Sequence, residues 1–284
     1  MDMENKVTLT AHRGWRAKYP ENTMRGFKEA MKLDIDGIEM DAHMTKDYRI
    51  VVCHDPTLDR TTDMTGAIRD LTLDEVRRAD AGIKFGEQFK GEKIPTFEEF
   101  LALMATRPDL RLLLELKDYP EECGDFAYAS ASETLSLCKQ YGVFGRDRLT
   151  VITFSTGICA WLRARYAKED FYIHGFYPKA LMRGSVADDP YKYYDEVCLF
   201  NFGDKDATGF PLRHESLVAD RARYKEFELM GIRPCVYYKL NTDENVYRHS
   251  FENGAQGFTC DDPDICGEIL DRIGARKLKN RVVQ

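Results

Sequence analysis

The segment GIEMDAH, residues 37–43, decides the fold of this 284-residue chain. Alternate side chains of a β-strand point to the same face, so Glu39, Asp41 and His43 share one face and the apolar residues between them share the other. Two carboxylates and an imidazole on one face of a buried strand are costly unless they are paired or bind a metal ion. The segment therefore predicts a buried strand that carries a polar site.

Similar short strand-like segments recur along the whole chain and alternate with segments of helical periodicity, which is typical of parallel α/β architecture. Eight such strands with helices between them predict a (β/α)8 TIM barrel, and 284 residues suits that fold. The predicted strands are 7–12, 37–43, 111–117, 149–155, 171–177, 196–202, 233–240 and 256–262. The predicted helices are 22–33, 96–106, 122–141, 156–168, 215–230, 242–253 and 263–273, and 178–195 is expected to be a loop with a short helix.

One segment interrupts the alternation. RIVVCHD, residues 49–55, follows the second strand after only TKDY, which is too short for a parallel crossover, so we expect an antiparallel hairpin. The polar residues 56–95 have few apolar positions, and we expect them to form a small insertion that caps one end of the barrel. The sequence contains no repeats or linkers, so 1–284 is predicted to be a single domain.

Composition excludes several classes of function. The net charge is −7 and the pI is about 5.5, which gives no electrostatic support for nucleic-acid binding. No stretch approaches eighteen consecutive apolar residues, so no membrane insertion is predicted. The amino terminus lacks the apolar core of a signal peptide, so we expect a cytoplasmic protein whose scattered cysteines are reduced and mostly buried.

A third carboxylate occurs in the segment LELK, where Glu115 and Lys117 share one face of an apolar strand. Barrel enzymes build their sites from the carboxyl ends of different strands, which is where Glu39, Asp41 and Glu115 occur. Carboxylates without a thiolate suit a hard divalent cation, Mg²⁺ or Ca²⁺. The alternative is a set of buried ion pairs, such as Glu115 with Lys117 or with an arginine of a neighbouring strand.

Two histidines fall at the same end of the predicted barrel. His12 ends the first strand and His54 ends the hairpin. A pair of imidazoles beside a cation suits acid–base catalysis on a phosphoryl group, although either one alone suits a hydrogen-bonded loop residue equally well. Arg13 and Lys117 could bind a phosphate. The other histidines are predicted to be structural or exposed: His174, His214 and His249.

Short motifs occur in order from about residue 8 to residue 264: HRG (12–14), PENT (20–23), GIEMD (37–41), TKD (45–47), VVCHDPTLDRTT (51–62), IPTFEE (94–99), LELK (114–117), ITFS (152–155) and CDDPD (260–264). In this order they resemble the glycerophosphodiester phosphodiesterase family. The resemblance implies a (β/α)8 barrel in which 56–95 is the small insertion. It also implies one divalent cation. The residues that it assigns are the metal ligands Glu39, Asp41 and Glu115, the catalytic pair His12 and His54, and the phosphate contacts Arg13 and Lys117.

The activity implied is hydrolysis of a small-molecule glycerophosphodiester, such as glycerophosphocholine, to an alcohol and sn-glycerol 3-phosphate. Which histidine is the acid, and whether water or a neighbouring hydroxyl attacks, stay open. One alternative is a lipid phosphodiesterase of the lysophospholipase D or sphingomyelinase D kind, which should show a basic or apolar rim that the sequence does not predict. The other is an inactive barrel that serves as a binding protein, which should have lost a ligand or a catalytic histidine.

The chain departs from the family pattern on the seventh predicted strand. Where the family often reads WTVN, this sequence has Tyr238-Lys239-Leu240-Asn241. We expect Tyr238 to keep an aromatic wall there. Region 178–213 matches the family pattern only weakly, so the sequence leaves open which alcohol the enzyme releases.

Overall fold

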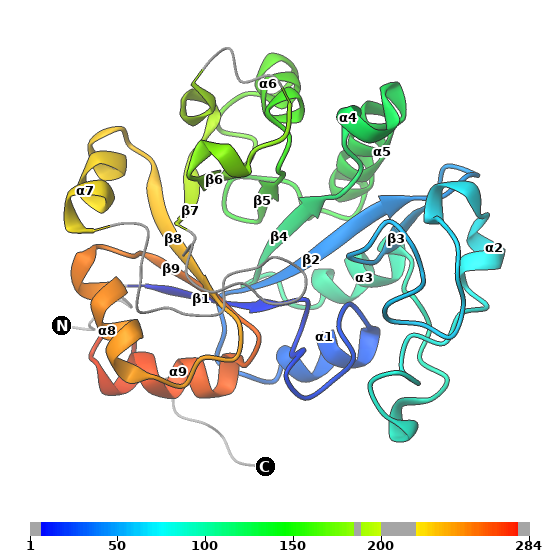
Figure 1. Ribbon diagram of the computed structural model, residues 1–284, viewed down its shortest axis with the longest axis horizontal. Helices are drawn as coiled ribbons and strands as arrows, with labels where there is room; N and C mark the ends of the chain where they lie inside the picture. The colour runs from blue at the N-terminus through cyan, green and yellow to red at the C-terminus, as the bar shows by residue number, and fades with distance from the viewer. Residues whose placement is uncertain (1–6, 185–188, 200–219, 278–284) are drawn as a thin grey trace.

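Eight parallel strands form a closed barrel (Figure 1). The computed structural model describes residues 7–184, 189–199 and 220–277. The first strand, β1, pairs with both β2 and β9, and this double pairing closes the sheet into a barrel as the sequence predicted. The barrel strands are β1 (Thr8–His12), β2 (Gly37–Met44), β4 (Arg111–Leu116), β5 (Leu149–Ile152), β6 (Tyr172–Tyr177), β7 (Glu196–Leu199), β8 (Arg233–Tyr238) and β9 (Gly257–Cys260).

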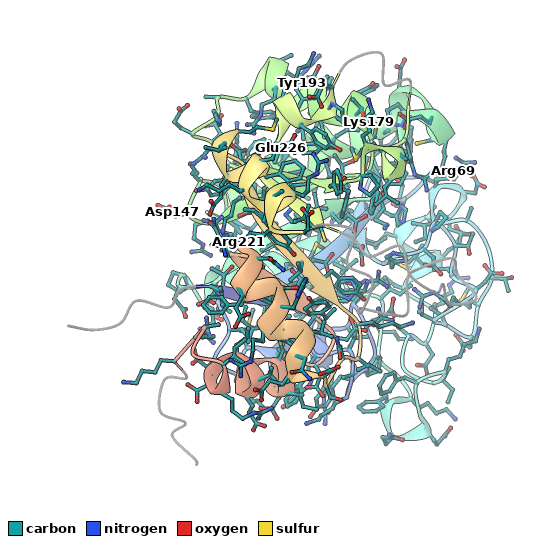
Figure 2. All side chains as sticks on the ribbon, turned by 60° about the vertical axis from the view of Figure 1, so that its left-hand side comes forward. Arg69, Asp147, Lys179, Tyr193, Arg221 and Glu226 are labelled. Atoms are coloured by element: carbon teal, nitrogen blue, oxygen red, sulfur yellow. The ribbon has the colours of Figure 1, made fainter. Side chains whose placement is uncertain are left out.

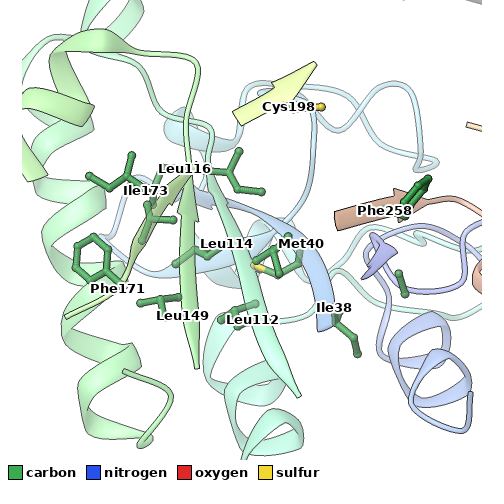
Figure 3. Packing of buried hydrophobic residues seen from close by; sticks show 14 of the residues in the cluster. Ile38, Met40, Leu112, Leu114, Leu116, Leu149, Phe171, Ile173, Cys198 and Phe258 are labelled. Atoms are coloured by element: carbon green, nitrogen blue, oxygen red, sulfur yellow. The ribbon is translucent and has the colours of Figure 1, made fainter. Parts of the chain in front are cut away.

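The apolar residues of GIEMDAH lie on the outer face of the barrel, beneath the helices. In the register of β2 and β4, Ile38 pairs with Leu112 and Met40 pairs with Leu114, and all four are fully buried. Figure 3 shows these side chains in one packed cluster. Burial of this face fixes the strand orientation, because a slip of one residue would turn the carboxylates into the hydrophobic layer.

The helices surround the strands, and several begin at residues typical of helix starts. The hydroxyl of Thr23 accepts a hydrogen bond from the backbone of α1, and Thr96 forms a capping box with Glu99 at α3. The helices of the barrel are α1 (Met24–Ala30), α3 (Phe97–Ala105), α4 (Pro120–Cys123), α5 (Asp125–Gln140), α6 (Thr156–Arg165), α7 (Arg221–Leu229), α8 (Glu244–Asn253) and α9 (Pro263–Arg272).

The predicted helix 122–141 is wrong in one respect. Two helices, α4 and α5, occupy this region, because Gly124 between them adopts a positive φ of 57° that breaks the helix. In the predicted loop 178–195, the short 3₁₀ helices η3 (Lys179–Leu181) and η4 (Pro190–Tyr193) agree with the expectation. The predicted strand residues 200–202, the helix residues 215–219 and His214 lie outside the described part of the chain.

The hairpin is present as predicted: β3 (Ile50–Val52) runs antiparallel to β2. Segment 56–95 follows it and contains η1 (Ile68–Asp70), α2 (Leu73–Val76) and η2 (Glu87–Phe89). The segment shares a small apolar core with the hairpin, which the polar sequence did not lead us to expect. This core contains Val51 and Cys53 of the hairpin and Leu58, Ile68, Val76, Ala79, Ala81 and Ile94 of the segment. That it is an insertion within a single domain stays a prediction.

The cysteines agree with the sequence interpretation. All eight lie in described residues, all are free thiols, and all except the half-buried Cys123 are buried. Within the described ranges, no helix combines the length and the apolar character that a membrane crossing requires. A cytoplasmic location stays a prediction.

Candidate active site

Three buried carboxylates meet at the carboxyl ends of neighbouring strands. Glu39 and Asp41 come from β2 and Glu115 comes from β4, where Asp41 and Glu115 are partners in the register. One oxygen of each lies within 4.8 Å of the others. Oε1 of Glu39 and Oδ1 of Asp41 are buried and have no hydrogen-bond partner. Buried carboxylate oxygens are otherwise paired, so this arrangement fits a cation held by the three groups.

The electrostatics of the cluster support the same interpretation. Burial, together with the charges of Asp41 and Glu115, raises the pKa of Glu39 well above its ordinary value. Burial also opposes ionisation of Asp41, but the positive charge of Arg13, followed by smaller effects of His54 and Lys117, holds the pKa of Asp41 below its ordinary value. Ionisation of Glu39 is thus disfavoured by its burial and by the neighbouring carboxylates, and a divalent ion would relieve this cost.

Buried ion pairs, the alternative considered from the sequence, are also present. Nζ of Lys117 lies 2.8 Å from Oε1 of Glu115 and 3.7 Å from Oδ1 of Asp41. The hydroxyl of Tyr119 also donates to Oε1 of Glu115 at 3.3 Å. These contacts leave Oε1 of Glu39 without a hydrogen bond, so the ion pairs do not satisfy every oxygen of the cluster.

The loop after β1 orients the carboxylates of β2. The backbone amide of Arg13 donates to Oε2 of Glu39 at 2.9 Å. The side-chain Nε of Arg13 lies 3.1 Å from Oδ2 of Asp41. Asn22 donates to the same Asp41 oxygen at 2.8 Å. Arg13 and Asn22 both have a positive φ, 54° and 55°. Such φ values are uncommon outside glycine, which indicates that the loop is held in this conformation by its contacts with the carboxylates.

His12 lies beside the carboxylate cluster and is oriented by a distant residue. Its Nε2 is 3.8 Å from Oε2 of Glu39, while its Nδ1 is 2.6 Å from Oδ1 of Asp261. The ring of Tyr237 packs against the imidazole at 4.5 Å, and the Tyr237 hydroxyl donates to the same Asp261 oxygen at 3.2 Å. Burial and the adjacent charge of Arg13 lower the pKa of His12 to about 4. His12 is therefore neutral near pH 7 and able to accept a proton.

His54 is held in a similar way on the hairpin side. Its Nδ1 lies 2.5 Å from Oδ1 of Asp55, and Asp55 is bound in turn by Nε of Arg60 at 2.6 Å. His43, the third polar residue of β2, lies with Nε2 3.3 Å from the carbonyl oxygen of His54 and Nδ1 2.7 Å from Asp118. Burial lowers the pKa of His54; the charge of Asp41 opposes this effect, and the charges of Lys117 and Arg13 add to it. Both histidines thus have a carboxylate on Nδ1.

The expectation for Tyr238 is wrong. Its side chain is buried in the core, where it packs against Tyr247 and Phe258 and its hydroxyl contacts Ser250. The aromatic ring that faces the site belongs to the preceding residue, Tyr237, because adjacent residues of a strand point to opposite faces.

The structure brings the predicted site residues together and adds positions that the sequence interpretation had not assigned. Asn22 and Glu21 lie in the PENT motif, Asp55 follows His54 directly, and Asp261 lies in CDDPD, so the motifs contained a signal for each of them. Glu21 pairs with Arg13, Arg16 and Arg60. Of the remaining histidines, His249 is exposed on α8, and His174 is buried on β6 beside Glu196.

Comparison with known proteins gives a family match. The model of the glycerophosphoryl diester phosphodiesterase family matches residues 12–264. A glycerophosphodiester phosphodiesterase of Caldanaerobacter subterraneus subsp. tengcongensis is 49% identical over 53% of this chain and 59% of its own length. YhdW of Bacillus subtilis is 44% identical over 41% of this chain and 47% of its own length, so this chain spans about half the length of these curated relatives. Another Bacillus subtilis protein, YqiK, is 30% identical over 92% of this chain and 98% of its own length.

Solved structures show the same fold. An Oleispira antarctica phosphodiesterase in complex with the product sn-glycerol-3-phosphate superimposes with a TM-score of 0.74, at 20% identity over 93% of this chain and 96% of that one. A glycerophosphodiester phosphodiesterase from Agrobacterium tumefaciens gives a TM-score of 0.67, at 21% identity over 91% of this chain and 98% of that one. The match to the family model covers most of the barrel and all of the clustered carboxylates and histidines. This chain belongs to the glycerophosphoryl diester phosphodiesterase family.

Proposed function

We propose that this protein hydrolyses glycerophosphodiesters, such as glycerophosphocholine, to an alcohol and sn-glycerol 3-phosphate. The observation that carries the proposal is the pair of buried oxygens without a hydrogen bond, Oε1 of Glu39 and Oδ1 of Asp41, in a carboxylate cluster beside two carboxylate-bound histidines. The family match supports phosphodiester chemistry in particular.

Glu39, Asp41 and Glu115 would hold the cation, which is Mg²⁺ or Ca²⁺ because all three donors are carboxylates. When bound, the cation supplies positive charge against the non-bridging oxygens of the phosphate, where negative charge grows in the transition state. Lys117 keeps Glu115 in place through its ammonium group. The buried position of the cluster strengthens these electrostatic effects, since little water is present to screen them.

His12 and His54 would divide the proton transfers. One accepts the proton of the attacking hydroxyl or water as the new P–O bond forms, and the other donates a proton to the alcohol oxygen as the old P–O bond breaks. Asp261 binds Nδ1 of His12 and Asp55 binds Nδ1 of His54. The Nε2 atom of each histidine is then the one that exchanges a proton with the substrate. A lowered pKa fits the histidine that acts as the base, because a base must be neutral when it accepts the proton.

Arg13 and Lys117 would contact the phosphate. The guanidinium of Arg13 is fixed between Glu21 and Asp41, and the ammonium of Lys117 lies next to Glu115 and Asp41. Both cations thus border the cluster that would bind the metal; Arg13 is buried and Lys117 is partly buried. Prepositioned charges of this kind cost little reorganisation when the substrate binds.

The proposal is tested by assaying the purified protein with glycerophosphocholine and measuring choline and sn-glycerol 3-phosphate separately. Equal amounts of the two products are expected, and only with Mg²⁺ or Ca²⁺ present. Release of phosphocholine and glycerol instead would mean that the other P–O bond breaks, and it would contradict the proposed reaction. The absence of turnover on any glycerophosphodiester, with metal bound, would favour the inactive-barrel alternative.

A further inference from the structure

A second cluster of potential metal ligands lies at the opposite end of the barrel. His174 is the third residue of β6, Glu196 is the first of β7 and Cys235 is the third of β8, so all three lie toward the amino-terminal ends of their strands. The cavity next to them has a volume of about 360 Å³. In Figure 2, Asp147, which also lines this cavity, lies on the opposite side of the view from Lys179, which follows the carboxyl end of β6. The cluster is thus separate from the catalytic residues.

The geometry of the three side chains fits one ion. All are buried, with at most 6% exposure, and one donor atom of each lies within 4.8 Å of the other two. The Nδ1 of His174 and Oε2 of Glu196 are 3.3 Å apart. Two such atoms bound to a tetrahedral zinc ion at about 2.0–2.1 Å would lie about 3.3 Å apart. These two ligands therefore already have the spacing that a tetrahedral ion requires.

The neighbouring residues direct the donors toward one another. Oε1 of Glu196 accepts a hydrogen bond from Nη1 of Arg233 at 2.9 Å, so Oε2 is the oxygen turned toward His174. The thiol of Cys235 lies against Gly257 of β9, where a Cβ atom would approach Sγ to 2.8 Å. A side chain at position 257 would displace the sulfur. Glycine here allows the thiol to occupy the inside of the barrel, next to the cavity.

The cavity is lined by charged groups of both signs. Two guanidinium groups, of Arg111 and Arg233, line the cavity together with the carboxylates of Asp36, Asp109, Asp147 and Glu196. The donor set differs from that of the active site, because it combines an imidazole, a thiol and one carboxylate. Such a set suits a borderline-soft ion of the zinc type, whereas Mg²⁺ and Ca²⁺ prefer oxygen ligands alone.

We propose that His174, Glu196 and Cys235 form a second, structural site for a zinc-type divalent cation at the amino-terminal end of the barrel. The cavity leaves room for a water molecule as the fourth ligand. The ion would link β6, β7 and β8 through one residue of each strand. Because the site exists only in the folded barrel, binding stabilises the native state.

The test uses the full-length protein, supplied first with excess Mg²⁺ and then with one equivalent of Zn²⁺. Zinc X-ray absorption is expected to show one sulfur neighbour at about 2.3 Å together with nitrogen and oxygen neighbours. No thiol belongs to the active-site carboxylate cluster, so the sulfur distinguishes the two sites. A zinc shell of nitrogen and oxygen alone in the wild-type protein would overturn the proposal, and this measurement requires no variant.

Variants identify the cysteine that supplies the sulfur ligand. Cys235→Ser should lose the sulfur neighbour and bind zinc at least about tenfold more weakly, and His174→Gln should weaken binding by a similar factor. Cys123→Ser is the matched control, because Cys123 is half-buried on α4 and outside the cluster, and it should bind zinc like the wild type. Zinc should raise the Tm of the wild type and of Cys123→Ser but not of Cys235→Ser. A sulfur neighbour retained in Cys235→Ser would assign the zinc to another cysteine and refute the proposed site.

Discussion

The Nδ1 atom of His12 lies 2.6 Å from Oδ1 of Asp261, although the two residues are 249 positions apart in the sequence. The contact forms because β1 and β9 are neighbours in the closed barrel, with Ala11 paired to Cys260. Asp261 fixes the orientation of the imidazole and directs Nε2 toward the carboxylate cluster. The contact is therefore a means of positioning the proposed acid–base residue.

Asp261→Asn should lower kcat by about 10²–10⁴-fold, because an amide no longer holds the imidazole in the required tautomer. Metal affinity should stay unchanged, since Asp261 lies outside the carboxylate cluster. Steady-state kinetics and metal titration measure the two effects. Asp262→Asn is the control, because the carboxylate of Asp262 accepts a hydrogen bond from Trp15 and not from a histidine. This variant should lower kcat far less than Asp261→Asn. Equal losses in the two variants would argue against a positioning role.

Removal of the cation should abolish hydrolysis, and Mg²⁺ or Ca²⁺ should restore it better than Zn²⁺, because the ligands at this site are carboxylates. Glu115→Gln should weaken metal binding by at least about tenfold and leave the barrel folded, since it replaces one charge with an isosteric amide. Glu98→Gln, at an ion pair with Arg49 outside the cluster, is the matched control. Full turnover in excess chelator, with metal absence confirmed by elemental analysis, would refute the prediction.

His12→Ala and His54→Ala should each lower kcat on glycerophosphocholine by about 10²–10⁴-fold. The double variant should lose less than the product of the single effects, because the two residues act as one unit. His249→Ala, on the exposed surface of α8, should be unchanged.

A nitrophenyl phosphodiester then assigns the two roles, because its leaving group departs without protonation. The variant of the histidine that acts as the general acid should recover most of its rate on this substrate, and the other variant should stay slow. Near-normal turnover of both alanine variants on glycerophosphocholine, with metal bound, would contradict the histidine mechanism.

Water-soluble diesters should be better substrates than micellar lysolipids. The chain carries a net charge of −7. The test compares kcat/KM for glycerophosphoglycerol with kcat/KM for micellar lysophosphatidylglycerol, an anionic lysolipid with the same head group. An acidic protein gains no electrostatic attraction to an anionic lipid surface. A higher kcat/KM for the lysolipid would support the lipid phosphodiesterase alternative.

Asp118→Asn should destabilise the fold in a pH-dependent way. Burial opposes ionisation of Asp118, but hydrogen bonds from His43, Ser130 and the amide of Met44 lower the pKa of this carboxyl below its ordinary value. A lowered folded-state pKa means that the ionised group stabilises the protein above about pH 4 and that this contribution is lost as pH falls further.

The free energy of unfolding, measured in urea, should therefore be lower for Asp118→Asn by about 1–3 kcal/mol at pH 7, and the difference should shrink below about pH 4. Asp74→Asn, on the exposed side of α2, should have little effect at either pH. A difference that is the same at both pH values would show that shape and packing, and not the charge of Asp118, cause the loss.

The sequence alone determined the features that depend on local periodicity. The two-residue repeat of a strand places Glu39 and Asp41 on one face of GIEMDAH, and the same repeat places Ile38 and Met40 beneath the helices. The alternation of strands with helices predicted the barrel, and the parallel direction of its strands placed the carboxylates at one end. These conclusions required no distant contact.

Tertiary structure decided everything that depends on which strands become neighbours. Closure of the barrel brings Asp261 to His12 and Arg60 to Glu21, and the register of β6, β7 and β8 gathers His174, Glu196 and Cys235. The way β8 packs in the barrel also decided which of its faces points inward, so that Tyr237, and not Tyr238, faces the site. The sequence identifies which side chains share a face of one strand. Only the closed sheet fixes distances between side chains far apart in the chain, because register and closure arise from the packing of the whole barrel.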